Sequence, residues 1–173
     1  MLFPMSKFEA PHRDVIHLLD QINVKEGLGT DLYEAVSRLT PSISVEAVVK
    51  NFDASKTLLI WRNDKMYGPG WHLPGGVLRF KETLKDRLFK TLDRELGITK
   101  ADITGPLGFH EIFNEKRDVR GHFISFVFEV IPHDPPSAKK QSGDKPSNGC
   151  WRWFETCPQN LIENQAAFRK YIK

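Results

Sequence analysis

The sequence predicts an α+β fold in which helices cover a mixed β-sheet. Two observations support this class: several segments alternate polar and apolar residues, as half-buried strands do, and one segment repeats leucine every fourth residue, as an amphipathic helix does. Strands and helices do not alternate regularly, so a repeated β-α-β arrangement is not expected. The chain has 173 residues, including 12 Phe and 4 Trp. This length and composition fit one globular domain with a small appendage and exclude extensive disorder.

The start of the chain is expected to form a helical extension. Residues 10–39 contain two short runs of apolar residues at helical spacing, and glycines separate them. Pro41 then prevents the second helix from continuing, because proline lacks the N–H group that a helix needs. We therefore expect an N-terminal helical extension over residues 1–40 and the main domain over residues 41–173. Dimer packing and a substrate lid both remain open as roles for the extension.

Two strands are predicted directly after this extension. Residues 42–49 read Ser-Ile-Ser-Val-Glu-Ala-Val-Val, close to the alternation of a half-buried strand, with Glu46 on the same face as the two serines. Residues 57–62 predict the second strand, after a turn-like segment at 51–55. Because such a turn joins them, we expect the two strands to pair as an antiparallel hairpin.

A glycine- and proline-rich loop and one helix follow. Residues 66–76 have no clear period and end in Trp-His-Leu-Pro-Gly-Gly, which favours an irregular loop. Residues 81–96 predict an amphipathic helix, since leucine recurs at every fourth position and charged residues lie outside that stripe. Gly97 is expected to end the helix, because glycine adopts the left-handed conformation of a C-cap without strain.

The remaining chain predicts further strands and a closing helix. Apolar alternation indicates strands over residues 105–113 and 122–131, and the second is expected to be buried on both faces. The polar, proline-containing run 132–148 predicts a long loop, and long loops in compact domains are often functional. A short strand over residues 150–154 and a helix over residues 159–171 complete the expected order.

Composition narrows the classes of function. The 25 Lys and Arg residues against 22 Asp and Glu residues give a formal net charge of +3, which is too small for a nucleic-acid-binding field but compatible with a polyphosphate ligand. Two cysteines exclude a disulfide scaffold and a four-cysteine zinc site. The chain begins with charged and proline residues instead of an apolar signal, and no apolar run is long enough to span a membrane. We therefore expect a cytoplasmic protein with no membrane or nucleic-acid partner.

The segment from Gly76 to Ile98 carries the most informative pattern. It resembles the Nudix hydrolase box, Gly-x5-Glu-x7-Arg-Glu-U-x-Glu-Glu-x-Gly-U, where U is apolar. Six of the nine specified positions match, namely Gly76, Glu82, Leu92, Glu95, Gly97 and Ile98. The remaining positions are occupied by Lys90, Thr91 and Arg94, where the box has Arg, Glu and Glu. The resemblance implies a Nudix-like α/β/α sandwich and a hydrolase of nucleoside diphosphate derivatives.

The resemblance also implies a divalent metal ion. In such a loop-helix-loop, the helix aligns carboxylates so that a hard cation is held against phosphate oxygens, which suits Mg²⁺ best and admits Mn²⁺. Glu95 corresponds to the metal-binding carboxylate and the Gly75 carbonyl to the backbone ligand. One carboxylate holds Mg²⁺ weakly, so the substrate's phosphates are expected to complete the site. For Glu82, a metal ligand and an ion pair that organises the box both remain open, and the ion pair is the commoner role; Gly76 and Gly97 are structural positions.

Within this superfamily the chain is similar to the GDP-mannose mannosyl hydrolases. That branch also lacks the two box glutamates that Thr91 and Arg94 replace here. The resemblance between this chain and the branch covers roughly residues 40–154, including the segments Thr-Pro-Ser-Ile-Ser-Val-Glu and Gly-Trp-His-Leu-Pro-Gly-Gly. The resemblance implies substrate contacts at Glu46, Arg62 and Lys90, where the branch has Asp, Arg and Arg. An arginine binds a diphosphate through two parallel hydrogen bonds, whereas a lysine supplies a point charge. A nucleotide sugar such as GDP-mannose as the ligand, and a homodimer, are also implied.

The proton acceptor of that reaction has no matching residue in this chain. The branch has a histidine in the loop before its Tyr-Arg-Trp strand, whereas residues 146–150 contain none, and Val77 replaces an arginine that follows Gly-Gly. His133 lies in the same long loop and would serve as the base if the loop folds back. Three functions stay open: glycosyl C–O cleavage that releases GDP and sugar, phosphoanhydride cleavage by a nucleotide pyrophosphatase, and a nucleotide-binding module with little turnover.

Overall fold

The computed structural model describes residues 10–23 and 26–173 and confirms the α+β class. Its helices and strands are α1 (Ala10–Leu19), α2 (Gly29–Val36), β1 (Ser42–Val49), β2 (Thr57–Arg62), β3 (Gly70–His72), β4 (Gly75–Val77), α3 (Leu84–Leu96), β5 (Ala101–Phe113), β6 (His122–Pro132), the 3₁₀ helix η1 (Ala138–Lys140), β7 (Trp151–Phe154) and the 3₁₀ helix η2 (Glu163–Tyr171). The two N-terminal helices are present, and β1 and β2 have the predicted bounds.

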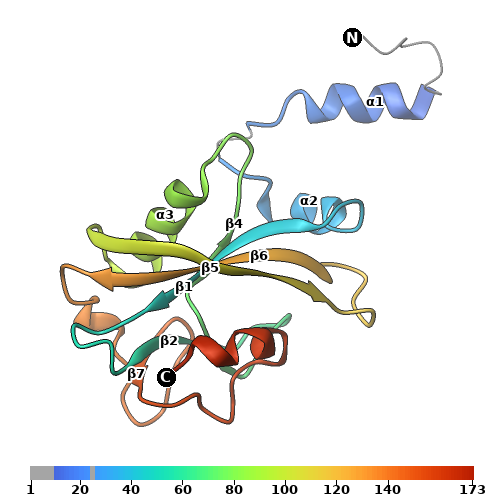
Figure 1. Ribbon diagram of the computed structural model, residues 1–173. Coiled ribbons are helices and arrows are strands. Elements are labelled where there is room, and N and C mark those ends of the chain that lie inside the picture. The colour runs from blue at the N-terminus through green and yellow to red at the C-terminus, as the bar shows by residue number, and fades with distance from the viewer. Residues whose placement is uncertain (1–9, 24–25) are drawn as a thin grey trace.

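The strands form two sheets (Figure 1). One has the strand order β4-β1-β6-β5 and the other β3-β2-β7. β1 and β6 are parallel, whereas the other neighbouring pairs are antiparallel, so the larger sheet is mixed, as predicted. β1 lies inside that sheet, with Val45 opposite Phe126 of β6 on one side and opposite Gly76 of β4 on the other.

The predicted hairpin between β1 and β2 is wrong. The two strands pair next to their turn, at a bridge between Lys50 and Thr57, and then separate into different sheets. β1 cannot continue this pairing because β4 and β6 occupy its two edges. β2 pairs instead with β3 and β7. The candidate site lies where the two strands diverge.

Helix α3 begins at Leu84 and not at the predicted Lys81. A capping box sets this start: Thr83 Oγ1 accepts the backbone N–H of Asp86 at 3.1 Å, and the Asp86 carboxylate accepts the backbone N–H of Thr83 at 3.3 Å. Lys81 has a left-handed φ of 57°, which a right-handed helix cannot contain. At the other end Gly97 is the left-handed C-cap, with a φ of 72°, as predicted.

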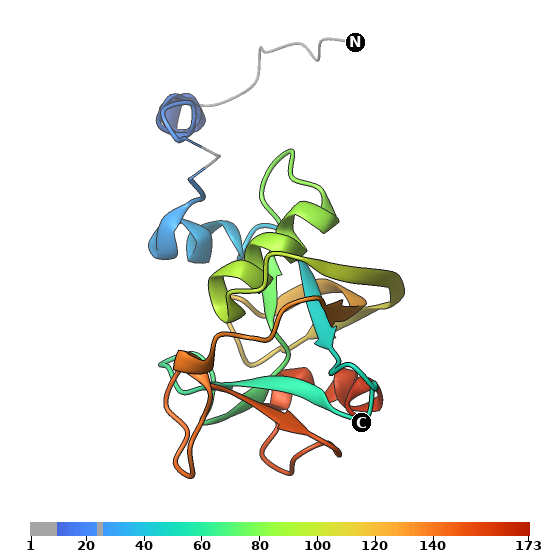
Figure 2. The same cartoon turned by 90° about the vertical axis from the view of Figure 1, so that its left-hand side faces the viewer.

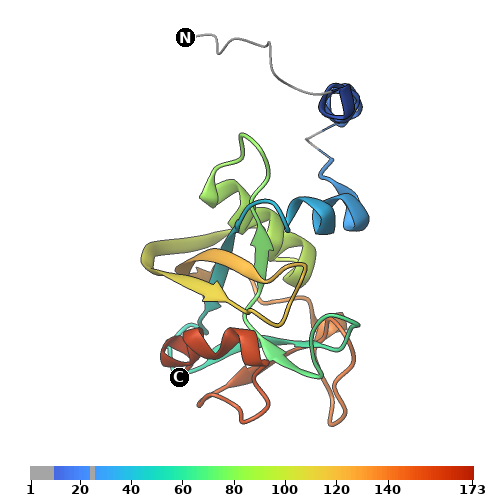
Figure 3. The same ribbon diagram turned by 90° about the vertical axis from the view of Figure 1, so that its right-hand side faces the viewer.

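Two apolar clusters join the layers. In the first, the leucine stripe of α3 packs against the odd-numbered residues of β1, such as Val45. In the second, Val48 on the opposite face of β1 packs with Phe168 of η2. Figures 2 and 3 accordingly show α3 and η2 on opposite sides of β1 and β6. Because side chains alternate along a strand, the even-numbered residues of β1, including Glu46, lie on the η2 side.

Several segments after β2 differ from their predicted form. The expected loop over residues 66–76 contains the short strands β3 and β4, and β5 begins before residue 105. The final helix is 3₁₀ and begins at Glu163. It starts late because the preceding residues pair with β3: the Trp71 N–H donates to the Asn160 carbonyl, and the Ile162 N–H donates to the Trp71 carbonyl, both at 2.9 Å.

The N-terminal extension reaches the domain through α2 and the turn after it. Arg120, in the loop between β5 and β6, donates its backbone N–H to Ser37 Oγ at 3.0 Å, and its guanidinium lies 3.3 Å from the Glu34 carboxylate. The Tyr33 hydroxyl lies 3.1 Å from Ser42 Oγ at the start of β1. α1 stands apart from the domain in Figures 1, 2 and 3.

No helix within residues 10–23 and 26–173 is long and apolar enough to cross a membrane. Residues 1–9 and 24–25 lie outside the described residues. The prediction that the chain starts without an apolar signal falls partly on residues 1–9, and so does the first part of the predicted extension.

Candidate active site

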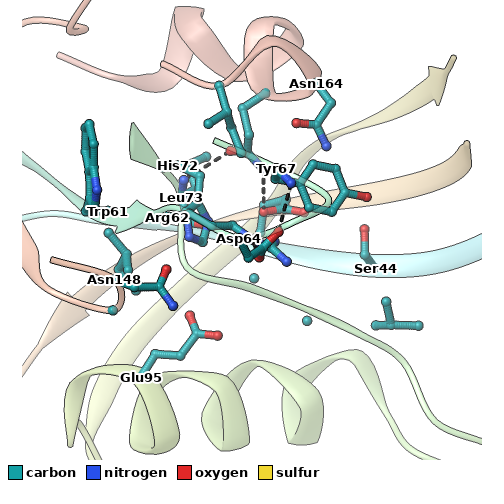
Figure 4. Close-up of a pocket in the computed structure, with 18 of the residues that line it drawn as sticks. Ser44, Trp61, Arg62, Asp64, Tyr67, His72, Leu73, Glu95, Asn148 and Asn164 are labelled. Atoms are coloured by element: carbon teal, nitrogen blue, oxygen red, sulfur yellow. Dashed lines mark hydrogen bonds and ion pairs between the residues drawn. The ribbon is translucent and has the colours of Figure 1, made fainter. Parts of the chain in front are cut away.

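A pocket of about 610 Å³ opens where the two sheets diverge. Among the side chains that line it are Glu46 from β1, Arg62 from β2, His72 from β3 and Glu95 from α3. Figure 4 shows Glu95 rising from α3 toward the side chains that the opposite wall presents. Gly75 and Gly76 also line the pocket. The tertiary structure therefore brings most of the residues selected from the sequence into one cavity, whose volume suits a small-molecule ligand.

Glu95 lies in the last turn of α3, and its carboxylate is asymmetrically bound. Its Oε1 accepts a hydrogen bond from Arg94 at 2.9 Å, whereas its Oε2 is buried and has no partner among the described residues. Burial raises the pKa of Glu95 above its ordinary value, although the Arg94 side chain and the nearby Gly75 backbone oppose the rise. A buried oxygen without a partner costs about 1–3 kcal/mol, so this carboxylate favours a cation beside it.

Gly75 and Gly76 allow β4 to pass closely between β1 and α3. A Cβ atom on Gly75 would lie 2.4 Å from Glu46 Oε2, and one on Gly76 would lie 2.6 Å from Thr91 Oγ1. Both separations are too short for a side chain. The glycine pair therefore has a steric role. Without side chains at these two positions, β4 lets β1, which carries Glu46, and α3, which carries Glu95, approach each other closely.

Glu46 is almost completely buried, with an exposed fraction of 7%. Its Oε2 accepts a 3.2 Å hydrogen bond from Nε2 of Gln165, which lies on η2. Burial, together with the nearby charge of Glu95, raises the pKa of Glu46 to about 8, although the hydrogen bond from Gln165 opposes the rise. Without a cation in the pocket, Glu46 is therefore mostly protonated at neutral pH.

Glu82 organises the start of α3 and lies outside the pocket lining. Its carboxylate lies 2.6 Å from Arg87 and 2.9 Å from Lys90, and it accepts the backbone N–H of Arg79 at 3.1 Å. These contacts match the ion-pair role left open for Glu82. They also hold Lys90 away from the pocket lining, although the resemblance implies that Lys90 contacts the substrate.

Arg62 is held at the pocket wall by its neighbours in the chain. Its Nε donates to Asp64 Oδ2 at 2.5 Å, and its guanidinium lies 4.3 Å from the centre of the Tyr67 ring. Asp64 is itself fixed, because its Oδ1 accepts the backbone N–H groups of Met66 and Tyr67, both at 2.8 Å. The guanidinium is therefore preorganised beside the cavity.

Two lysines of η1 add positive charge at the end of α3. Lys139 and Lys140 line the pocket, and Lys140 Nζ donates to the backbone carbonyls of Arg94 and Glu95 at 2.7 and 3.1 Å. A positive charge at this position stabilises the C-terminal end of the helix, because the last carbonyl groups lack partners within the helix. The loop over residues 132–148 thus packs on the turn that carries Glu95.

His133, the candidate base from the sequence, lies elsewhere. Its backbone N–H donates to the Lys100 carbonyl at 3.0 Å, and its Nε2 lies 3.1 Å from Asp102 Oδ1. The side chain is half exposed and does not line the pocket. β6 extends to Pro132, so the chain carries His133 along the edge of the sheet beside β5 before the loop can turn back.

The structure adds pocket residues that sequence reasoning had not selected. Gln165, Tyr33 and Arg120 reach the pocket from η2, α2 and the loop between β5 and β6. They lie far apart in the sequence and belong to no motif, so no local pattern identifies them. Arg94 had a usable signal, because it replaces a box carboxylate directly before Glu95.

The pocket fits a divalent cation with few protein ligands. The buried, unpartnered Glu95 Oε2 is the observation that supports such a site, and the charges of Glu95 and Glu46 affect each other. Among residues 10–23 and 26–173, no three His, Cys, Asp or Glu side chains gather in a group that could hold a metal. Glu95 and the backbone of Gly75 would hold the ion, with Glu46 nearby, and phosphate oxygens and water would complete its coordination.

Comparison with known proteins gives a consistent family pattern. A family model described as the NUDIX domain matches residues 40–168. The low-salt glycan biosynthesis protein Agl8 of Haloferax volcanii is 33% identical over 108 residues, which are 60% of this chain and 67% of that protein. The ADP-ribose pyrophosphatase of Methanocaldococcus jannaschii is 24% identical over 135 residues, which are 78% of this chain and 75% of that protein.

One solved structure shows the same fold at low sequence identity. The crystal structure of the MutT NUDIX hydrolase from Burkholderia pseudomallei matches with a TM-score of 0.57 and 18% identity, covering 78% of this chain and 99% of that chain. At this identity the match supports the arrangement of helices and strands and says nothing about the ligand.

Proposed function

This chain belongs to the NUDIX family, and we propose that it hydrolyses a nucleoside diphosphate linked to a sugar. The expected substrate is GDP-mannose or a close relative, with cleavage of the glycosyl C–O bond and release of GDP and the free sugar. The observation that carries the proposal is the set of ionisable groups in the pocket, where Glu46 and Glu95 lie within one cavity with Arg62 and Arg94.

The guanidinium groups support binding of the diphosphate. Arg62 is preorganised by Asp64 and Tyr67, and an arginine can bind two phosphate oxygens through parallel hydrogen bonds. Arg94 lies beside Glu95, so a diphosphate that reaches Glu95 also meets a second guanidinium. These contacts would hold the diphosphate along the α3 side of the pocket.

The carboxylates support a cation-assisted reaction. A divalent ion bound at Glu95 would neutralise the negative charge of the diphosphate when the diphosphate departs as the leaving group. Glu95 offers its unpartnered Oε2, and Arg94 holds the other oxygen of the same carboxylate, which orients the group. Glu46 is buried beside Gly75 and would face the sugar end of the substrate.

The names of the relatives support the substrate class. One acts in glycan biosynthesis, and the other is named for ADP-ribose, which is itself a nucleoside diphosphate linked to a sugar. The second relative favours the alternative reaction, in which water attacks phosphorus and the phosphoanhydride bond breaks. The likeness to the GDP-mannose branch favours attack at the sugar carbon.

A second candidate function is a nucleotide-binding module with little turnover. It is favoured by the replacement of two box carboxylates by Thr91 and Arg94, and by the ion pair that Arg94 makes with Glu95 at 2.9 Å. An arginine on the metal-binding carboxylate competes with a cation for the same group. A module of this kind would bind the nucleotide tightly and release no product.

Product analysis in labelled water separates these functions. The protein is incubated with Mg²⁺ and either GDP-mannose or ADP-ribose in ¹⁸O-water, and the products are weighed by mass spectrometry. Label in the free sugar supports C–O cleavage, and label in a phosphate product supports the pyrophosphatase. Binding of both ligands without product supports the module. If the protein neither binds nor hydrolyses these ligands, the result contradicts the proposed function. A homodimer remains a further proposal, tested by the mass of the protein in solution.

A further inference from the structure

We propose that His72 is a specificity residue whose Nε2 accepts a hydrogen bond from a sugar hydroxyl of the substrate. This inference rests on the proposed function and deepens it, because it names a substrate feature that the pocket recognises. The residue acts by binding, and no proton transfer is assigned to it.

Strand pairing places His72 beside the diphosphate-binding wall. β2 and β3 are antiparallel, with Ile60 opposite His72 and Arg62 opposite Gly70. Directly opposite residues point to the same face of a sheet, and so do alternate residues of one strand. His72, Ile60 and Arg62 therefore share a face, and all three line the pocket. Figure 4 labels His72 and Arg62 at this wall.

A backbone contact fixes the tautomer of the imidazole. Nδ1 of His72 lies 2.7 Å from the carbonyl oxygen of Leu73, and a carbonyl can only accept, so Nδ1 carries the hydrogen. Burial and the charge of Arg62 together lower the pKa of His72 to about 4, so the ring is neutral at pH 7. A neutral ring with hydrogen on Nδ1 has a bare lone pair on Nε2.

This acceptor has no protein partner among the described residues, and it shares that state with Glu95 Oε2, which would face the cation. Both oxygens of Asp64 are occupied, the Asn148 Oδ1 accepts the backbone N–H of Asn63 at 3.0 Å, and both ends of the Gln165 amide are used. No hydrogen bond to Nε2 of His72 is made within the described residues. A ligand atom that fills this place must therefore donate.

The chemistry of the ligand narrows the donor to a hydroxyl group. An ionised diphosphate offers acceptors only, so it would leave the Nε2 lone pair unmatched. Arg62 lies on the same face as His72, and under the proposed function it contacts the diphosphate. The group next to a diphosphate in a nucleotide sugar is a sugar on either side, so the hydroxyl belongs either to the transferred sugar or to the ribose.

A panel of deoxy analogues tests the inference and distinguishes these two sources. GDP-mannose is compared with analogues that each lack one hydroxyl of the mannose or of the ribose, using wild type, His72→Phe and His72→Gln. We expect His72→Phe to lower kcat/KM for GDP-mannose on the order of 10-fold. For the analogue that lacks the recognised hydroxyl, the same substitution should cause almost no loss. His72→Gln should restore much of the activity, since its amide oxygen can accept.

Other outcomes overturn the inference. Equal losses on every analogue would indicate a structural role for His72, and unchanged activity would show that nothing binds Nε2. Circular dichroism and thermal melting check that the variants fold, and His72→Ala replaces His72→Phe if the larger ring prevents folding. If wild type turns over neither GDP-mannose nor ADP-ribose, the proposed function fails, and calorimetric binding of the same panel decides the role of His72 independently; absence of binding overturns both.

Discussion

Gln165 and Glu46 are joined by a 3.2 Å hydrogen bond from Nε2 to Oε2, across 119 positions of the sequence. The Oε1 of the same amide accepts the backbone N–H of Leu73 at 3.0 Å. One side chain of the C-terminal helix η2 thus fixes a buried carboxyl on β1 and the segment that leads into Gly75. The pocket wall is built by the end of the chain as well as by the Nudix box.

Replacing Gln165 with leucine should destabilise the protein. The substitution removes the hydrogen bonds that the Leu73 N–H and the Glu46 Oε2 make in a buried site, and each group left unsatisfied costs about 1–3 kcal/mol. Urea unfolding measures the loss, with the exposed Glu163→Gln on the same helix as the control. A Gln165→Leu protein as stable as wild type would show that water replaces both bonds.

Gly76→Ala should be destabilising for a steric reason. The new Cβ would lie 2.6 Å from Thr91 Oγ1 and 3.0 Å from Arg87 Cδ, and such overpacking costs about 1–3 kcal/mol. Thr91→Ala in the same chain should recover part of that loss. Gly143→Ala is the matched control, because its Cβ would have no neighbour within 4 Å. Thermal unfolding compares the variants, and equal midpoints for the two alanine variants would contradict the close packing of β4.

Glu95→Gln should lower activity while leaving stability intact. The amide cannot carry the negative charge that a cation needs, so we expect a loss on the order of 100-fold in kcat. Stability should not fall, because the wild-type carboxylate is buried with one unpartnered oxygen. Calorimetric titration of Mg²⁺ in the presence of GDP measures the metal, and the exposed Asp93→Asn is the control. Unchanged Mg²⁺ binding would remove Glu95 from the site.

Substitutions of Glu82 and Lys90 should show whether each residue stabilises the fold or contacts the substrate. Glu82→Gln weakens the pairing of Arg87, whose side chain is 4% exposed, and should cost about 3 kcal/mol. Lys90 is 63% exposed, so Lys90→Ala should change stability by less than about 1 kcal/mol. The KM of the Lys90→Ala variant for GDP-mannose should stay within about 2-fold of the wild-type value, because a surface substitution away from the pocket has little effect. A large rise in KM would restore the substrate contact that the family resemblance implies.

Acid should destabilise the protein in part through His72. Its folded pKa is about 4, below the ordinary 6.5, because burial and Arg62 disfavour the charged ring. Between these values the unfolded chain binds more protons, so stability falls as pH decreases from about 6.5 toward about 4. His72→Gln should remove this contribution, which is on the order of 3 kcal/mol. Urea unfolding of both proteins across that range gives the difference, and parallel curves would contradict the shift.

Local patterns in the sequence determined much of the secondary structure. The strands over residues 42–49 and 57–62 follow from alternation, and α3 follows from its leucine stripe and from Gly97 at its end. These signals lie within a few residues of each other, so they are readable without the fold. The Nudix box likewise identified Glu95, because its spacing is local.

Tertiary structure alone decided the partners of these elements. Whether β1 pairs with β2 depends on β4 and β6, which reach its edges from elsewhere in the chain. The same holds for Gln165 on Glu46 and for Lys140 on the last turn of α3, and it holds for His133, which β6 carries away from the pocket. Burial, pKa values and charge pairing arise from packing between distant segments, and for that reason the sequence could name Glu95, Glu46 and Arg62 as candidates but not the contacts that Gln165 and Lys140 make around them.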